Sequence, residues 1–144
     1  MKRSLAALAL LAAVAFAAPA SAADRLVSLT LDGRPVDRAG GIAVLHDGVV
    51  CADVVDLVKS FDGLLTFQGK AVVVTINGVT ARFTPGSRTA TVNDGAITMD
   101  TQVFVRNGDI FVPLNAFVTR VAQAKVRFNP GRTHADIYVN ASPT

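Results

Sequence analysis

Cys51 and His46 are the residues of this sequence that best fit nucleophilic chemistry. They lie five positions apart, and an imidazole base can activate a thiol. The competing interpretation is structural, because a free cysteine is among the residue types most often buried in a core. A comparison of the two halves of the chain, described below, aligns Cys51 with Phe111 and favours a buried thiol. A hydrolase that uses Cys51 is kept as the third alternative for function.

Metal ligands are the next chemistry to consider, since all eleven acidic residues are Asp. A calcium loop needs carboxylates at dense one, three, five spacing. The most regularly placed aspartates instead occupy separate turns: Asp32, Asp47, Asp62 and Asp94. The two histidines, His46 and His134, fall in different halves, and we find no His-x-His, Cys-x-x-Cys, Ser-His-Asp or Gly-rich phosphate motif. We therefore predict no metal site, no cofactor and no enzymatic activity.

Basic residues are concentrated in the second half of the chain. From Asp24 to Val79 five Lys and Arg face seven Asp, whereas from Thr80 onward seven face four. Such an excess can attract an anionic envelope polymer, although most charged residues simply form a solvated surface. The candidate binding residues are Arg82, Arg88, Arg106, Lys125, Arg127 and Arg132.

Residues 1–22 are typical of a signal peptide. Residues 1–3 form a basic start, residues 5–18 are apolar, and residues 20–22 read A-x-A, so we expect a mature chain that begins at Ala23. Loss of Lys2 and Arg3 leaves twelve basic residues against eleven acidic ones. This near-neutral charge favours no nucleic-acid partner, and no later segment is long enough for a membrane span. We expect export to the periplasm or to the outside of the cell.

The elements that must position these residues are marked by glycines that follow Asp or Asn. This dipeptide readily adopts the positive φ angles of a tight hairpin turn. Six of the eleven glycines have this context: Gly33, Gly48, Gly63, Gly78, Gly95 and Gly108. The apolar runs between them predict short antiparallel strands at 27–31, 42–45, 49–51, 64–67, 71–76, 79–83, 90–92, 103–105, 110–112, 125–128 and 135–139.

Two segments have the period of a helix instead. Apolar residues recur at i, i+3, i+4 and i+7 in 53–61 and again in 113–121. Leu57, Phe61, Phe117 and Val121 should be buried on these helices, and Gly63 should end the first one as a left-handed cap. The single cysteine rules out an internal disulfide, so packing must stabilise the fold.

The two halves of the chain also resemble each other. Residues 26–77 can be laid over residues 88–140 at an offset of about sixty, with strands, hairpin and helix in the same order. The strand at 79–83 would bridge the copies. We therefore predict an α+β fold in which two tandem copies of a strand-rich unit, each with antiparallel hairpins and one short helix, form one compact domain.

The second copy carries a specific motif. Residues 106–115 read RNGDIFVPLN, preceded by Val92-Asn93-Asp94-Gly95 and followed by Val126-Arg127-Phe128 and residues 135–139. This pattern resembles the copper amine oxidase N-terminal-like domains, or stalk domains, of exported bacterial proteins. The first copy matches more weakly, with residues 50–54 in place of the Val-Pro-Leu core, so the resemblance covers residues 23–144.

That resemblance implies a domain outside the catalytic core of amine oxidases, without copper or a quinone cofactor. We predict an exported, non-catalytic structural or binding module of the cell envelope or periplasm, with an envelope polymer or an exported protein as its partner. The alternative is a small periplasmic recognition or inhibitor protein that binds a protein or anionic polymer through loops or a sheet edge. The oligomeric state does not follow from these patterns.

Overall fold

A computed structural model describes residues 24–36 and 42–139 of the chain. The expected signal peptide, residues 1–22, lies outside the described residues. The fold is α+β, as predicted, because short strands dominate and two short helical segments interrupt them. In chain order the elements are β2 (Arg25–Leu26), β3 (Ser28–Leu31), β4 (Arg34–Pro35), β5 (Ala43–His46), β6 (Val49–Asp53), α1 (Val54–Ser60), β7 (Leu64–Gln68), β8 (Ala71–Ile76), β9 (Val79–Phe83), β10 (Thr89–Val92), β11 (Gly95–Thr98), β12 (Phe104–Arg106), β13 (Asp109–Pro113), α2 (Leu114–Ala116), the π-helix η3 (Phe117–Val121), β14 (Lys125–Phe128) and β15 (His134–Tyr138).

The described strands form three sheets with the orders β11-β10-β9-β8-β7, β12-β13-β6-β5-β2 and β14-β15-β3-β4. Strand β9, expected between the copies, pairs with both β8 and β10. Strand β15 pairs in parallel with β3, from the opposite end of the chain. Each half of the chain therefore contributes strands to a sheet that the other half completes.

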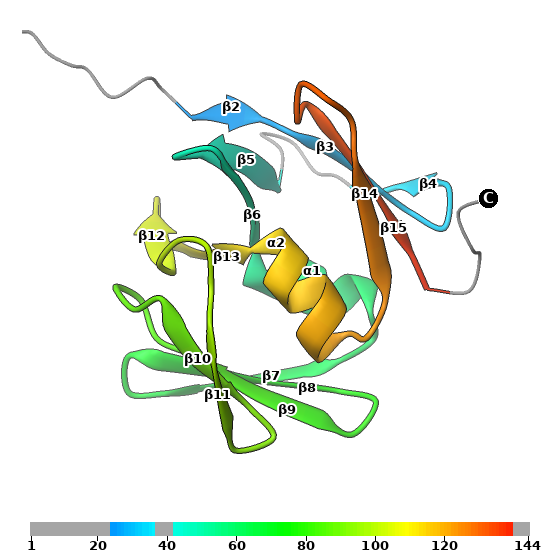
Figure 1. Cartoon of the computed structure of the whole chain (residues 1–144). Coiled ribbons are helices and arrows are strands. Elements are labelled where there is room, and N and C mark those ends of the chain that lie inside the picture. Colours follow the sequence, from blue (N-terminus) through cyan, green and yellow to red (C-terminus); the bar gives the residue numbers. More distant parts are fainter. Residues whose placement is uncertain (1–23, 37–41, 140–144) are drawn as a thin grey trace, which may run out of the picture.

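The helices occupy the middle of the molecule. Figure 1 shows α1 and α2 between the five-stranded sheet of β7 to β11 below and the four-stranded sheet above, with β5, β6, β12 and β13 closing the side. Phe83 and Phe117 are fully buried there, with ring centroids 6.1 Å apart. Burial from two sheets explains how helices this short persist, since isolated helices of this length are unstable in water.

Four of the six Asp-Gly or Asn-Gly pairs form the predicted two-residue hairpin turns. Both residues have positive φ at Asp32-Gly33, Asp47-Gly48, Asn77-Gly78 and Asn107-Gly108, as a type I′ turn requires. The pair at 94–95 differs, because the two turn residues are Asn93 and Asp94, with φ of 48° and 69°, and Gly95 already pairs with Val92.

Helix α1 begins and ends through side-chain and backbone caps. Asp53 caps its start by accepting a hydrogen bond from the Val55 N–H at 2.9 Å. At its end Asp62, not Gly63, adopts the left-handed conformation, with φ of 56°. The Gly63 N–H then bonds to the Val58 carbonyl at 2.9 Å, as in a Schellman motif. Our prediction for Gly63 was wrong in conformation: this residue is required because a Cβ there would lie 2.7 Å from the Ile76 side chain.

The second helical segment is wider than predicted. Its first turn is α2, but η3 is a π-helix in which the Ala122 N–H bonds to the Phe117 carbonyl, five residues back. Gln123, with φ of 53°, ends it in the left-handed conformation. Asp62 and Gln123 are thus 61 residues apart, whereas the helices begin 60 apart at Val54 and Leu114. The stretch from Leu114 to Gln123 is therefore one residue longer than the stretch from Val54 to Asp62, as the wider π-turn requires.

Three of the four predicted helix core residues are fully buried, namely Leu57, Phe117 and Val121. Phe61 is only half-buried, which corrects our prediction. It is the C-cap of α1 and lies at the rim of the core, with its ring 6.2 Å from that of Phe117. In the part of the chain that the structure describes, no helix has the length and apolar character to cross a membrane.

Candidate functional site

The outer face of the four-stranded sheet carries four hydrogen-bonded side chains that we call the polar ladder: Ser28, Thr30, His134 and Asp136. The parallel register of β3 and β15 places His134 opposite Ser28 and Asp136 opposite Thr30. Their neighbours Leu29, Ala135 and Ile137 point inward and are buried. Because side chains alternate between the faces of a strand, the polar ladder faces outward.

Hydrogen bonds connect the ladder across the two strands. Ser28 Oγ lies 2.6 Å from His134 Nδ1, and His134 Nε2 lies 2.7 Å from Asp136 Oδ1. Thr30 donates its hydroxyl to the same Asp136 oxygen. The hydrogen bonds from Thr30 and then from His134 lower the pKa of Asp136, and the positive charge of Arg127 adds to this effect. Asp136 is therefore an anion at neutral pH that anchors both partners.

The ladder brings together a serine, a histidine and an aspartate, which corrects our statement that the chain has no such set. If Nε2–H donates to Asp136, Nδ1 accepts from Ser28 and can act as a base toward it. The imidazole and the carboxylate are about one third exposed, at 37% and 33%, on an open sheet surface. Water competes for hydrogen bonds on such a surface, and efficient acyl transfer requires a water-excluded oxyanion site. The arrangement is best explained as a cross-strand structural network.

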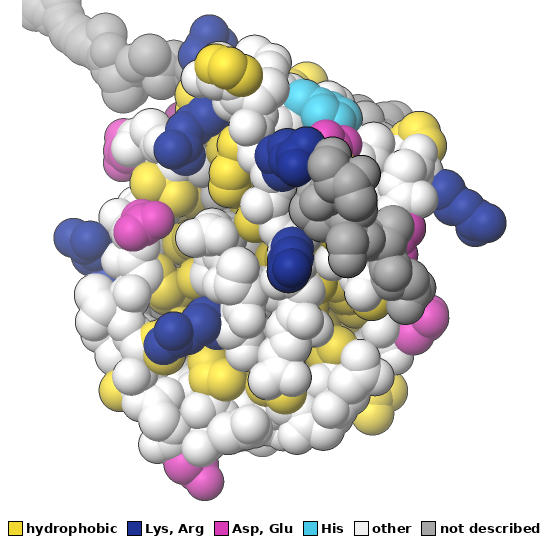
Figure 2. Space-filling view, turned by 45° about the vertical axis from the view of Figure 1, so that its right-hand side comes forward, with side chains coloured by type: hydrophobic (Ala, Val, Ile, Leu, Met, Phe, Trp, Pro, Cys, Tyr) yellow, Lys and Arg dark blue, Asp and Glu magenta, His cyan; other side chains and the backbone are white. Residues whose placement is uncertain are grey.

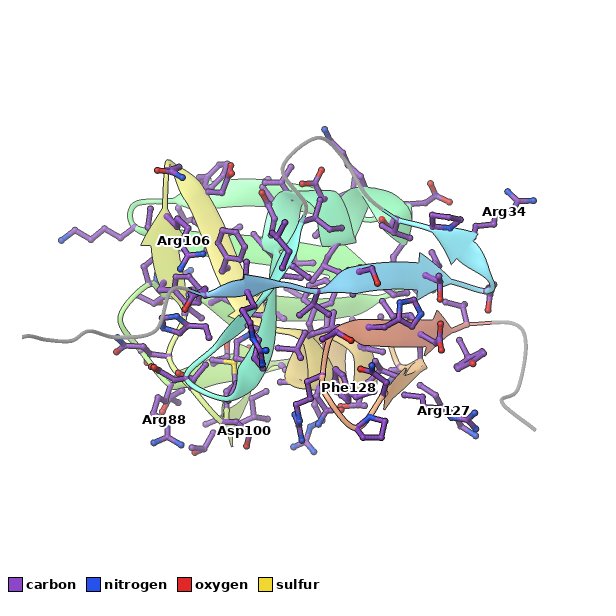
Figure 3. The ribbon with its side chains drawn as sticks, turned by 90° about the horizontal axis from the view of Figure 1, so that it is seen from above. Arg34, Arg88, Asp100, Arg106, Arg127 and Phe128 are labelled. Atoms are coloured by element: carbon purple, nitrogen blue, oxygen red, sulfur yellow. The ribbon has the colours of Figure 1, made fainter. Side chains whose placement is uncertain are left out.

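Three of the predicted binding residues lie on the hairpin beside this ladder, and we call Lys125, Arg127 and Arg132 the basic hairpin. Lys125 and Arg127 are exposed on β14 and lie opposite Tyr138 and Asp136. Arg132 is exposed in the turn, with its guanidinium carbon 5.4 Å from the centroid of the Phe128 ring. Figure 3 shows Arg127 extending outward from the sheet. Residues 125–138 carry three basic side chains and one acidic one, so this hairpin is locally cationic.

Arg82 and Arg88 lie elsewhere. Arg82 is on β9, on the opposite side of the helices, and donates to the Gln68 side chain at 2.8 Å. It lines a shallow depression of about 380 Å³ with Thr80 and Thr91. Arg88 precedes β10 and donates to the Met99 carbonyl at 3.2 Å. In Figure 3, Arg88 and Arg127 lie toward opposite ends of the molecule.

Arg106, the sixth candidate, is engaged within the protein. It forms an ion pair with Asp24, whose carboxylate also lies 2.8 Å from His46 Nδ1. Its guanidinium lies over the Phe104 ring, and His46 stacks on the same ring with centroids 4.1 Å apart. Arg106 therefore fixes the start of the described chain to β12. The structure does not gather the six candidates on one face, and in Figure 2 Lys and Arg are spread singly over the visible surface.

Cys51 is fully buried in a small cluster with Val44 and Phe111, as predicted. Burial, and then the negative charge of Asp47, raise the pKa of the thiol from 9.0 to about 12. The thiol is thus protonated at neutral pH, and a protonated buried thiol is a poor nucleophile. His46 is directed to Asp24 and Phe104 instead.

Metal ligands do not converge in the part of the chain that is described. No three His, Cys or Asp side chains gather there in a group suited to a metal ion. The aspartates of the turns serve the backbone instead: Asp32 accepts a hydrogen bond from the Val139 N–H at 2.9 Å, and Asp47 and Asp62 adopt positive φ.

The polar ladder is the feature that sequence reasoning missed. Ser28 and His134 are separated by 106 residues, and each belongs to an ordinary alternating strand. The sequence signal for this network is that Thr30 and Asp136 also occupy outward positions of those strands. The network could be predicted only if the parallel pairing of β3 and β15 were already known.

A family model described as the copper amine oxidase N-terminal domain matches residues 30–137. The matched span includes both helical segments and strands from each of the three described sheets, and strand β2 precedes it. No curated protein matches the chain.

Proposed function

Since the chain belongs to the copper amine oxidase N-terminal domain family, we propose that it is an exported, non-catalytic structural or binding module of the periplasm or cell envelope. The family match supports the non-catalytic part, because this domain is a non-catalytic module in copper amine oxidases. The composition of residues 1–22 supports export.

The module is built, in our proposal, from two tandem copies. Three observations support this inference: the β5-β6 and β12-β13 hairpins each lead directly into a helix, β6 pairs with β13, and each half completes the other's sheet. Exchange of strands between copies joins them into one unit. Such a unit is a rigid spacer or scaffold whose outer sheet faces are available for contacts.

The binding surface we propose is the basic hairpin, and its partner is an anionic envelope polymer. The observation that carries this proposal is that Lys125, Arg127 and Arg132 are exposed within one fourteen-residue hairpin with a single acidic residue. Asp136 is held by Thr30 and His134, so it neutralises Arg127 only in part. Guanidinium groups bind phosphate and carboxylate oxygens with two parallel hydrogen bonds.

The test is retention of the purified protein on immobilised polyphosphate, together with co-sedimentation with isolated envelope material. Binding should weaken as salt rises from about 0.1 M to about 1 M, because the Debye length falls from roughly 10 Å to roughly 3 Å. A triple charge reversal of Lys125, Arg127 and Arg132 to Glu should abolish retention. Circular dichroism should show an unchanged fold, since surface substitutions usually change stability by about 0.5 kcal/mol or less.

The matched control is the triple reversal of Arg25, Arg82 and Arg120 to Glu. These three residues are also exposed but lie on different elements, and the change in net charge is the same. Near physiological salt this variant should keep most of its retention. Equal loss in both variants would show a response to net charge alone and would refute a local site at the basic hairpin.

A further inference from the structure

Strand β7 is an edge of its five-stranded sheet and, among the described strands, is hydrogen-bonded only to β8. An edge strand presents backbone N–H and C=O groups on its outer side, where another strand can pair with them. Its sequence, Leu-Leu-Thr-Phe-Gln, contains neither a charge nor a proline.

Most of the other edges of the described sheets are blocked. Soluble proteins block an edge with charged side chains, with proline or with very short strands. Four of the remaining edge strands contain such residues: β2 has Arg25, β4 has Arg34 and Pro35, β12 has Arg106 and β14 has Lys125 and Arg127. The fifth, β11, has only small residues and Ile97.

Strand β7 also bears the two most exposed large apolar side chains of the described surface. Leu64 is 73% exposed and Phe67 is 61% exposed. Phe67 lies opposite Val72, which is fully buried and faces the core. The Phe67 ring is therefore on the core side of the sheet, at an edge beyond which no described strand lies.

The segment around β7 is complementary to itself. If two copies pair antiparallel about Thr66, then Leu65 of each lies opposite Phe67 of the other, and Asp62 lies opposite Lys70. Both charged residues are exposed. Opposite residues within the strand point to the same face of the sheet in this register, so Leu65 and Phe67 meet twice about the axis, whereas Leu64 lies opposite Gln68. Asp62 and Lys70 lie in the turns that flank the strand, one opposite charge at each end of the pairing. Aromatic–aliphatic and opposite-charge cross-strand pairs stabilise a sheet.

We propose that the protein forms a symmetric dimer through β7, in which two five-stranded sheets join into one of ten strands. The Leu65–Phe67 match, made twice about the axis, together with the opposite charges of Asp62 and Lys70 in the flanking turns, points to a second copy of this chain as the occupant of the edge. An interface of one short strand pair is small, so the dimer is a weak, concentration-dependent one. This dimer is independent of the basic hairpin, which is on a different sheet.

Disulfide trapping tests the register. Thr66→Cys places two thiols opposite each other at the symmetry axis, at a Cα separation of about 4.5 to 5.5 Å that a disulfide can span. Mild oxidation of the full chain should give a disulfide-linked dimer. Thr80→Cys is the matched control, because Thr80 is exposed on the same sheet face but on the interior strand β9. Equal cross-linking of both variants, or none of Thr66→Cys, overturns the proposal.

Sedimentation velocity with charge variants tests the partner. Asp62→Lys and Lys70→Asp each place like charges opposite one another in a homodimer, so each variant alone should sediment as a monomer. An equal mixture should dimerise, because every pair is then complementary. Phe67→Lys should also abolish dimerisation, whereas Val105→Lys, at an apolar site 55% exposed on β12, should not. A wild type that stays monomeric at all concentrations, or a dimer that Phe67→Lys leaves intact, overturns the proposal.

Discussion

Ala52 lies directly opposite Val112 in the antiparallel pairing of β6 and β13, and sixty residues separate the two. The flanking pairs are Cys51 with Pro113 and Asp53 with Phe111. A shift of sixty residues converts each flanking pair into the other, as a twofold axis between the two strands would. This register supports the inference of two tandem copies, and both residues at the axis are fully buried.

A volume exchange at this axis tests the contact. Directly opposite residues have Cβ atoms about 4.5 to 5.5 Å apart, so Ala52→Val alone should overpack the site and Val112→Ala alone should leave a cavity. The double variant conserves volume and should be more stable than the sum of the two changes predicts, by about 0.5 to 3 kcal/mol. Urea denaturation of the four proteins measures this coupling, and simple additivity would contradict it.

Phe117 is predicted to be a principal source of stability. It is fully buried between Phe61 and Phe83. Phe117→Ala should lower the free energy of unfolding by about 3 to 5 kcal/mol, through lost burial and a residual cavity. Val105→Ala, at an exposed position, is the control and should change it by about 0.5 kcal/mol or less. Similar denaturation midpoints for Phe117→Ala and wild type would show that the Phe117 side chain does not face the core.

Gly63 is predicted to be intolerant of any side chain. A Cβ would lie 2.7 Å from Ile76 Cγ1 and 2.8 Å from the Thr75 carbonyl oxygen. Because the backbone oxygen belongs to a sheet strand and cannot move away, Gly63→Ala should lower the melting temperature clearly. Gly131→Ala is the matched control, since its Cβ would only reach an ordinary contact at 3.9 Å. Equal melting temperatures for the two variants would contradict the close packing of Gly63.

Asp53 is predicted to act as a cap through its oxygen and not through its charge. Asp53→Ala removes the acceptor for the Val55 N–H and should cost about 0.5 to 2 kcal/mol. Asp53→Asn retains the acceptor.

The pH dependence of stability tests the charge of Asp53. Burial raises the pKa of Asp53 above 3.8, so protonation of this carboxyl stabilises the folded wild type at low pH. That stabilisation is lost as pH rises through the folded pKa. The Asn variant should therefore gain stability relative to wild type between about pH 3 and about pH 7. Urea denaturation of both proteins at the two pH values measures this change. A loss of stability of Asp53→Asn relative to wild type as pH rises would refute the prediction.

Cys51 is predicted to be inert in the native state. A soluble alkylating agent should label it slowly until the domain unfolds, and rapid native labelling would restore the nucleophile hypothesis. Its pKa is raised from 9.0 to about 12, so the protonated thiol stabilises the fold fully below pH 9.0. This contribution is lost as pH rises toward the folded pKa. Wild type should therefore lose stability relative to Cys51→Ala over that range, as measured by thermal denaturation at increasing pH.

The local elements followed from the sequence alone. Asx-Gly pairs encode hairpin turns through their φ preferences, and the i, i+3, i+4, i+7 pattern encodes helices, so both are readable within a dozen residues. The strands expected at 71–76, 79–83 and 125–128 occur at those bounds. The family also followed from a local motif, RNGDIFVPLN, and the family match confirms it. The burial of Cys51 followed from its alignment with Phe111.

Only the tertiary structure decided which strands became neighbours. The parallel pairing of β15 with β3 created the contact of Ser28 with His134, and the division of the basic residues among three sheets left Lys125, Arg127 and Arg132 on one hairpin. The physical reason is that turn and helix preferences depend on residues close together in the sequence. Strand partners are instead selected by how well the whole core is buried, and no short segment determines that burial.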